Sequence, residues 1–167
     1  MKTFICLLIL ASLPSYGQVR NACVEVPLTL TDNAGGNTIL IVGLDPTATD
    51  GIDPHWGEAE LPPAPPSGVF DARLIGVLLG QGTLKNIRPG QCADVPYTKM
   101  DTIQYQVGSG TTITICWSLP NWVTWRLQDI IFGTIIDVPM LGNGCYTVTN
   151  PTAFSRLKLT ARYPLIM

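Results

Sequence analysis

The densest group of residues that could do chemistry lies in segment 45–73, DPTATDGIDPHWGEAELPPAPPSGVFDAR, which also holds the single histidine of the chain. Its carboxylates suit either general acid–base catalysis or the binding of a hard cation through oxygen ligands. Asp45, Asp50 and Asp53, with backbone carbonyls, are the candidate calcium ligands, although their spacing differs from that of an EF-hand. The third interpretation is structural, because Asp-Pro and Asp-Gly pairs favour turns.

A catalytic interpretation of this segment finds little support in the sequence. Catalysis of this kind needs paired carboxylates at a defined separation, or a nucleophile beside a base. Glu58 and Glu60 stand only two residues apart, and no partner for His55 can be identified. The chain contains neither a GxSxG nor a HExxH motif. We therefore predict no catalytic residue, no enzyme activity and no cofactor, with calcium as the one ion that the segment could hold.

The structural interpretation, which we favour, makes residues 45–69 an ordered, proline-rich connector. Its LPPAPP stretch favours polyproline II geometry, which is stiff and has no internal hydrogen bonds. Such a connector would deliver GVFDARL as the next strand, with Trp56 pinning it to the core. Asp71 and Arg73 would lie on one side of that strand, where they can bond each other or the backbone of a loop.

The segments around the connector alternate between apolar and polar residues, as β-strands do. VEVPLTLT is followed across the turn DNAGGN by NTILIVGL, which predicts a hairpin. TIQYQV and TTITICW, joined by GSG, predict a second hairpin, and CYTVT and FSRLKLTARY supply later strands. No segment keeps an apolar period of 3.6 residues, and 16 glycines and 14 prolines separate the short strands. We predict an all-β fold, a single antiparallel β-sandwich with Ig-like or jelly-roll-like topology and two disulfides.

The N-terminus has the features of a secretory signal peptide. A lysine precedes the apolar run at 4–13, and Ser15 and Gly17 stand at the −3 and −1 positions of a cleavage site. We predict a signal peptide at 1–17, one domain at 18–167, and a secreted protein that is extracellular or at the cell surface, with the periplasm as a possible station in transit. No later stretch has about 18 uninterrupted apolar residues, so no membrane span is expected.

Charge is sparse along the whole chain. Charged residues make up 13% of the sequence, against about 25% in typical soluble domains. The formal net charge is −2, and the basic residues form no run, which argues against nucleic acid as a partner. A surface with few charges favours association with copies of the same chain or with other proteins.

Four cysteines follow the predicted cleavage site: Cys23, Cys92, Cys116 and Cys145. An even number in an exported protein predicts two disulfides, and the sequence allows all three pairings. Strand alternation places Cys116 and Cys145 on the threonine-bearing sides of their strands. We favour Cys116–Cys145, which leaves Cys23–Cys92 as the second bridge.

GLDPTATDGIDPHWGEAELPPAPPSGVFDAR resembles the signature of an Ig-like or fibronectin-III-like β-sandwich domain of secreted bacterial proteins associated with type IX secretion. TTITICWSLP, TWRLQDIIFGTIIDVPM, GCYTVTNP and RLKLTARY follow in the order that this resemblance implies. It implies an extracellular module without catalytic residues. Two features depart from the pattern: no C-terminal sorting domain follows ARYPLIM, and Cys116 and Cys145 replace small residues, which supports their pairing.

Two groups of apolar residues are candidates for ligand or interface contacts. Trp122 and Trp125 flank VT in PNWVTWRL, and aromatic side chains on a sheet edge stack on sugar rings or fill protein contacts. Leu165, Ile166 and Met167 form an apolar tail that could dock on a neighbouring subunit. We therefore expect a non-enzymatic structural protein that assembles with itself, as a homo-oligomer or polymer such as a filament or surface layer, or with other surface proteins. The alternative is an extracellular module that binds a polysaccharide or another surface ligand through the two tryptophans and the 45–60 loop.

Overall fold

The structure is a computed structural model that describes residues 21–91 and 96–163. Three predictions lie outside the described residues: the signal peptide at 1–17, the part of a second disulfide that involves Cys92, and the contacts of the tail residues Leu165, Ile166 and Met167. Within the described ranges, no helix is long and apolar enough to cross a membrane.

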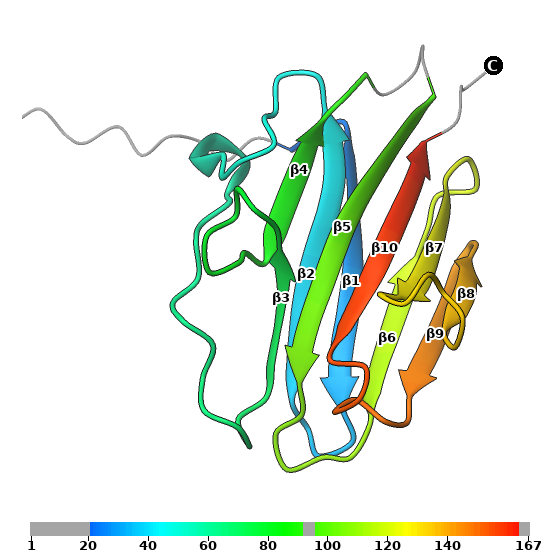
Figure 1. Cartoon of the computed structure of the whole chain (residues 1–167). Helices are drawn as coiled ribbons and strands as arrows, with labels where there is room; N and C mark the ends of the chain where they lie inside the picture. Colours follow the sequence, from blue (N-terminus) through cyan, green and yellow to red (C-terminus); the bar gives the residue numbers. More distant parts are fainter. Residues whose placement is uncertain (1–20, 92–95, 164–167) are drawn as a thin grey trace, which may run out of the picture.

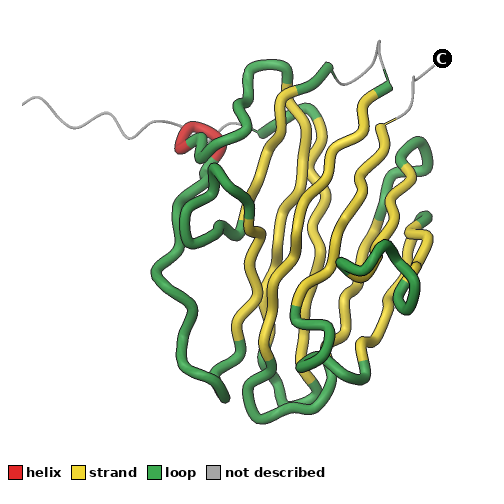
Figure 2. The backbone as a smooth tube through the Cα atoms, viewed as in Figure 1, coloured by secondary structure: helices red, strands yellow, loops and turns green. Residues whose placement is uncertain are grey.

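The described part of the chain forms ten strands and one short 3-10 helix, η1 (Pro54–Trp56). Strands and loops make up nearly all of the chain trace in Figure 2. The strands are β1 (Val24–Asp32), β2 (Asn37–Asp45), β3 (Asp71–Ile75), β4 (Lys85–Pro89), β5 (Tyr97–Gln106), β6 (Ile113–Ser118), β7 (Thr124–Asp129), β8 (Asp137–Met140), β9 (Asn143–Val148) and β10 (Arg156–Tyr163). The all-β prediction is confirmed.

The strands pair into two five-stranded sheets. The first, which we name the β1 sheet, has the order β4-β2-β1-β6-β9, and the second, the β10 sheet, has the order β3-β5-β10-β7-β8. Neighbouring strands are antiparallel except β2 and β4, which are parallel. In Figure 1 the β10 sheet lies in front of the β1 sheet.

One predicted hairpin is confirmed and the other is wrong. β1 and β2 pair in antiparallel register around the turn that follows Asp32. β5 and β6, predicted as the second hairpin, belong to different sheets. The loop between them crosses from one sheet to the other, and the β1–β2 turn holds it there: Gly108 donates its N–H to Asp32 Oδ2 at 2.9 Å, and Thr111 donates to Asn33 Oδ1 at 2.7 Å. A short glycine turn is therefore compatible with either connection, and these long-range bonds decide between them.

The inner faces of both sheets contribute to one hydrophobic cluster. Leu28 and Leu30 of β1 and Leu157 and Leu159 of β10 are all completely buried within it. Burying a side chain of this size stabilises the fold by about 1.5–3 kcal/mol relative to leaving it in water. Because side chains alternate along a strand, this burial directs the intervening residues of β10 to the outer surface.

The disulfide Cys116–Cys145 is present, as predicted. The two residues stand directly opposite each other in the antiparallel ladder of β6 and β9, with a Cα–Cα distance of 4.0 Å. It joins neighbouring strands of one sheet, on the threonine-bearing side that strand alternation indicated.

Candidate functional site

The structure does not bring the three calcium candidates together as a ligand set. Asp45 Oδ1 accepts hydrogen bonds from Thr47 N at 2.9 Å and from Thr47 Oγ1 at 2.8 Å. Asp53 accepts from Thr49 N at 2.6 Å and from Thr49 Oγ1 at 3.1 Å, and Asp50 pairs with Arg88 at 3.3 Å. Across residues 21–91 and 96–163, no group of three or more His, Cys, Asp or Glu side chains is placed to hold a metal ion.

The glutamates of the same segment tie it to the rest of the fold. Glu58 is buried and accepts from the N–H of Ile87 at 2.5 Å and from the N–H of Asp53 at 2.8 Å. Burial raises the pKa of this carboxyl, although both hydrogen bonds act in the opposite direction. Glu60 accepts from Gln81 N at 2.8 Å. The carboxylates of Glu58 and Glu60 therefore hold this segment against β4 and against the loop that contains Gln81.

Two polar side chains hold the proline-rich part of the connector. Gln106 Nε2 donates to the carbonyl oxygens of Pro65, Pro66 and Val69 at 2.7–3.1 Å. Arg73 is buried and donates to the carbonyl oxygen of Pro62 at 2.8 Å. Because polyproline geometry leaves carbonyls without internal partners, these side chains supply donors that the segment lacks.

Both tryptophan candidates pack against the hydrophobic core. Trp125 is 3% exposed and meets Tyr163 edge-to-face, with ring centroids 6.2 Å apart. The reason is strand alternation, which places Trp125 on the inner side of β7 with Leu127. Trp122 is partly buried and packs against the same core. Of the two roles that the sequence left open for Trp125, packing or a ligand contact, the structure shows packing.

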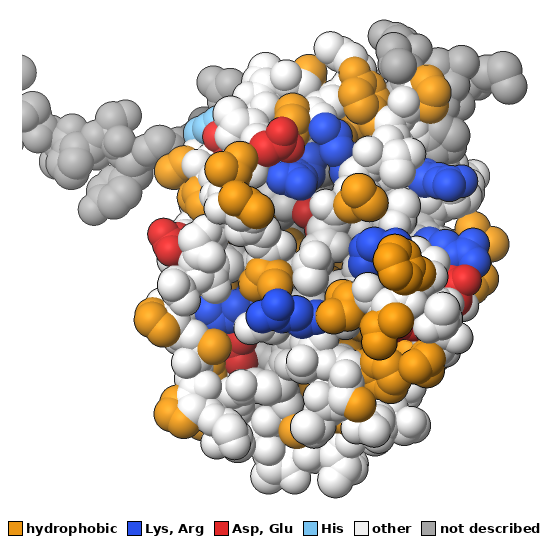
Figure 3. All heavy atoms as spheres, in the orientation of Figure 1, with side chains coloured by type: hydrophobic (Ala, Val, Ile, Leu, Met, Phe, Trp, Pro, Cys, Tyr) orange, Lys and Arg blue, Asp and Glu red, His pale blue; other side chains and the backbone are white. Residues whose placement is uncertain are grey.

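The outer side of β7 and β10 carries four basic side chains, which we name the cationic face: Arg126, Arg156, Lys158 and Arg162. The two strands are neighbours, with Thr160 opposite Arg126 and Arg162 opposite Thr124. Figure 3 views this side of the molecule and shows basic side chains spread across it. The sequence as a whole has a net charge of −2, so the cationic face departs from the overall balance.

Acidic groups are scarce around these cations. Among the outward positions of β5, β7, β8 and β10, Asp137 is the single carboxylate that the described strands present. It receives two hydrogen bonds from the guanidinium of Arg126. This pairing raises the pKa of Arg126 and lowers the pKa of Asp137. Among the described residues, Arg156, Lys158 and Arg162 form no ion pair, and Arg156 donates instead to Gln104 Oε1 at 2.9 Å.

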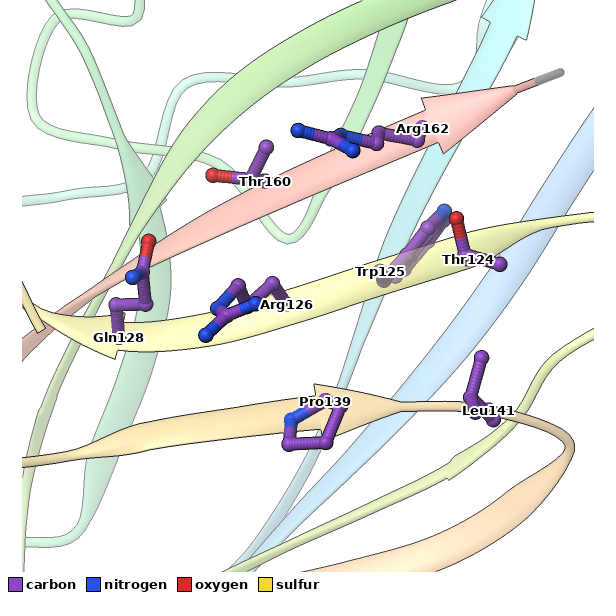
Figure 4. A pocket seen from close by; sticks show the side chains of 8 residues that line it. All are labelled: Thr124, Trp125, Arg126, Gln128, Pro139, Leu141, Thr160 and Arg162. Carbon is purple, nitrogen blue, oxygen red and sulfur yellow. The ribbon is translucent and has the colours of Figure 1, made fainter.

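A groove of about 440 Å³ lies beside Arg126 and Arg162 of the cationic face, and Figure 4 shows the side chains that line it. Its lining comes from β7, β10 and the β8 region: Thr124, Trp125, Arg126, Gln128, Pro139, Leu141, Thr160 and Arg162. Guanidinium groups bind carboxylate, sulfate or phosphate through two parallel hydrogen bonds, and the threonine and glutamine side chains bond hydroxyl groups. The groove is thus equipped to hold an anionic, hydroxyl-rich molecule.

The loop between β7 and β8, residues 130–136, lies next to this face and has the sequence IIFGTII. Ile130, Ile131, Phe132 and Ile135 are exposed, although the run is as apolar as a buried strand. Sequence analysis did not single out this loop. The signals that could have found it are the flanking Asp129 and the internal Gly133, which suit a turn better than a strand.

Comparison with known proteins found no matching family model, no matching curated protein and no matching solved structure. The resemblance to β-sandwich domains of secreted bacterial proteins remains a hypothesis from the sequence. The residues of the cationic face and their contacts carry the functional argument.

Proposed function

We propose that this chain is an exported, non-enzymatic β-sandwich module of Ig-like or jelly-roll-like topology that binds an anionic polymer of the cell surface, such as an acidic polysaccharide. The predicted signal peptide and the resemblance to secreted bacterial domains support the location. The observation that carries the binding function is the cationic face, four basic side chains on two adjacent strands of a chain whose net charge is −2; among the described residues only Arg126 is paired with a carboxylate, that of Asp137.

The spacing of these cations suits an extended ligand. Alternate residues of a strand lie about 6.6 Å apart, and neighbouring strands about 4.8 Å apart. Arg156 and Arg162 therefore lie about 20 Å from each other along β10, with Lys158 between them. A polymer that repeats a carboxylate or sulfate along its length can contact several of these groups at once, which raises its effective affinity.

Retention on immobilised acidic and neutral polysaccharides, for example polygalacturonate and dextran, tests the proposal. We expect retention on the acidic polymer that weakens as salt is raised, because exposed charges are screened. The double variant R126Q/R162Q should lose most of this retention. Lys99→Gln is the matched control, because Lys99 lies on the opposite side of β5, with Nζ 5.9 Å from the Tyr97 ring centroid. Equal retention on dextran, or an unchanged double variant, would contradict the proposal.

A second function, self-assembly, is favoured by the outer side of the β1 sheet. The outward positions of β6 and β9 carry no charge, and they are Thr114, Cys116, Ser118, Asn143, Cys145 and Thr147. In β1, Thr29 and Thr31 continue this neutral surface, and Glu25 pairs with Lys85 at its end. β9 is also an edge strand, and an edge without charged side chains is open to pairing with another chain.

We propose that filaments or layers, where they form, use this neutral face and the β9 edge. Light scattering of the purified protein over a range of concentrations tests it, with Thr147→Lys as the variant that places a charge on the edge. Large particles that disappear in T147K support assembly through β9. A monomer at every concentration, or particles that T147K leaves unchanged, would contradict it. The tail Leu165, Ile166 and Met167 is tested separately with a chain that ends at Tyr163.

A further inference from the structure

The β7–β8 loop exposes four large apolar side chains beside the cationic face. The exposed fractions are 62% for Ile130, 55% for Ile131, 89% for Phe132 and 65% for Ile135. None of the seven residues 130–136 is charged. Exposed apolar side chains close together on a protein surface mark a site that contacts another protein, a ligand or a membrane.

The buried carboxylate of Asp129, at the end of β7, accepts hydrogen bonds from the backbone of this loop. Asp129 Oδ1 accepts from the N–H groups of Ile131 and Gly133 at 2.7 and 3.1 Å. Its Oδ2 accepts from Ile135 and Ile136 at 2.8 and 2.7 Å. These four bonds, that from Ile136 first, lower the pKa of Asp129. Because the donors are already satisfied, an apolar environment around the tip would not leave them without partners.

The backbone at the tip is unusual for an aromatic residue. Phe132 has a φ of 63°, and within the described residues it is the one non-glycine residue with a positive φ. A bulky side chain rarely adopts this left-handed conformation, which costs free energy that burial does not return at an exposed position. The loop thus leaves 89% of Phe132 in water, and a partner that covers the ring would add the free energy of apolar burial that the free protein lacks.

The basic residues near Phe132 indicate which kind of partner would cover its ring. The loop leaves β7 after Asp129, which pairs with Leu157 of β10, and Gln128 pairs with Lys158. Arg156 and Lys158 therefore stand at the same end of the sheet as the loop. Figure 3 shows apolar side chains directly beside basic ones on this face. Apolar side chains that enter the acyl region, with lysine and arginine at headgroup level, are the combination that binds an anionic bilayer.

We propose that this face docks on a bilayer with anionic headgroups: Ile131 and Phe132 insert, while Arg156 and Lys158 contact headgroup phosphates. The electrostatic half of this inference rests on the proposed function, since it uses the same cationic face. A second copy of the chain is a poorer partner through the face that we propose for its assembly. Its neutral outer face on β6 and β9 offers no carboxylate to meet these cations.

Co-sedimentation with vesicles tests the inference, using phosphatidylcholine alone and phosphatidylcholine mixed with phosphatidylglycerol. We expect the protein to bind the mixed vesicles only, and Phe132→Ser to weaken this binding at least tenfold. Val77→Ser is the matched control, because Val77 is a fully exposed apolar residue in a different loop. An unchanged melting curve for F132S establishes that the variant is folded.

The outcomes separate this inference from the proposed function. Binding to acidic polysaccharide without binding to vesicles overturns the bilayer proposal and leaves the proposed function in place. Vesicle binding that F132S leaves unchanged shows attachment by charge alone, and it also overturns insertion. A Phe132-dependent dimer without vesicle binding makes a second copy the partner instead. If the protein binds vesicles through Phe132 but is not retained on acidic polysaccharide, the bilayer proposal is supported and the proposed function is overturned.

Discussion

Arg73 and Asp71, two residues apart on β3, form a bidentate ion pair with both N–O distances at 2.7 Å. Nη1 of the buried guanidinium donates to the carbonyl oxygens of Pro62 and Gln81, each at 2.8 Å. The pairing with Asp71 raises the pKa of Arg73. One side chain thus joins β3, the connector and the loop that follows β3, so the connector depends on an interaction that is not part of either sheet ladder.

Replacing Arg73 should therefore destabilise the whole fold. Arg73→Met leaves Asp71 and two carbonyls without their donor, and we expect the free energy of unfolding to fall by about 3–5 kcal/mol. Arg73→Lys should recover only part of this loss, because an ammonium group cannot reproduce the planar fork. Urea unfolding measures both variants. Arg162→Met is the control: Arg162 is exposed on β10, and its loss should change stability by about 0.5 kcal/mol or less. A similar effect at both positions would contradict the role of Arg73.

The disulfide between β6 and β9 should contribute measurably to stability. Its cysteines are 29 residues apart in sequence, and a loop of this size predicts a contribution of about 2–4 kcal/mol. The double variant C116A/C145A should unfold at correspondingly lower urea concentration, with its fold retained by the hydrophobic cluster. No change in the unfolding midpoint would mean that strain in the native bridge cancels its effect on the unfolded chain.

Peptide mapping without reduction tests the cysteine pairing of the whole chain. We expect a Cys116–Cys145 peptide, as in the structure, and predict a Cys23–Cys92 peptide in protein from an oxidising compartment. A peptide that joins Cys23 to Cys116 or to Cys145 would overturn both pairings together.

Two aspartates should make stability fall in acid. Burial raises the pKa of Asp32, but the backbone N–H groups of Gly36, Gly108, Ala34 and Gly110 outweigh it and lower the pKa. The pKa of Asp129 is also lowered, by the loop N–H groups described above. In the unfolded chain both groups titrate near their ordinary value of about 3.9. Their contribution is therefore complete above about pH 5 and is lost as the pH falls through the lower native values.

Comparison of the native chain with Asp129→Asn isolates this effect. The stability gap between them should be largest above about pH 5 and shrink below about pH 4. Glu58 and Asp101, whose pKa values are raised by burial, act in the opposite sense in both proteins and cancel in the difference. A gap that stays constant from neutral pH to acid would show that the loop does not depend on the charge of Asp129.

Removing divalent cations should leave the fold unchanged. Asp45 and Asp53 already accept hydrogen bonds from Thr47 and Thr49, so their turns form without an ion. We expect the melting temperature in EDTA to equal that in calcium within error. A tightly bound ion stabilises by mass action, so a clear drop on chelation would restore the calcium hypothesis for Asp45, Asp50 and Asp53.

The sequence by itself determined the features that depend on local alternation. The period of two in VEVPLTLT and RLKLTARY identified strands and their buried sides, and DNAGGN identified the β1–β2 turn. The same alternation placed Cys116 and Cys145 on matching sides of their strands. These predictions succeed because the side-chain period of a strand is a property of a few consecutive residues.

Only the tertiary structure decided which strands are neighbours. The GSG turn does not indicate whether β6 pairs with β5 or crosses to the other sheet. The hydrogen bonds that Gly108 and Thr111 donate to Asp32 and Asn33 hold the crossing connection. The sequence left open whether Trp125 packs inside or contacts a ligand, and the position of β7 places its ring against Tyr163. The cationic face joins Arg126 to residues about thirty positions later in β10, and no local pattern contains that pairing. Which strands pair depends on apolar surface that segments far apart in the sequence bury together. The alternation of side chains, by contrast, depends only on the residues within one strand.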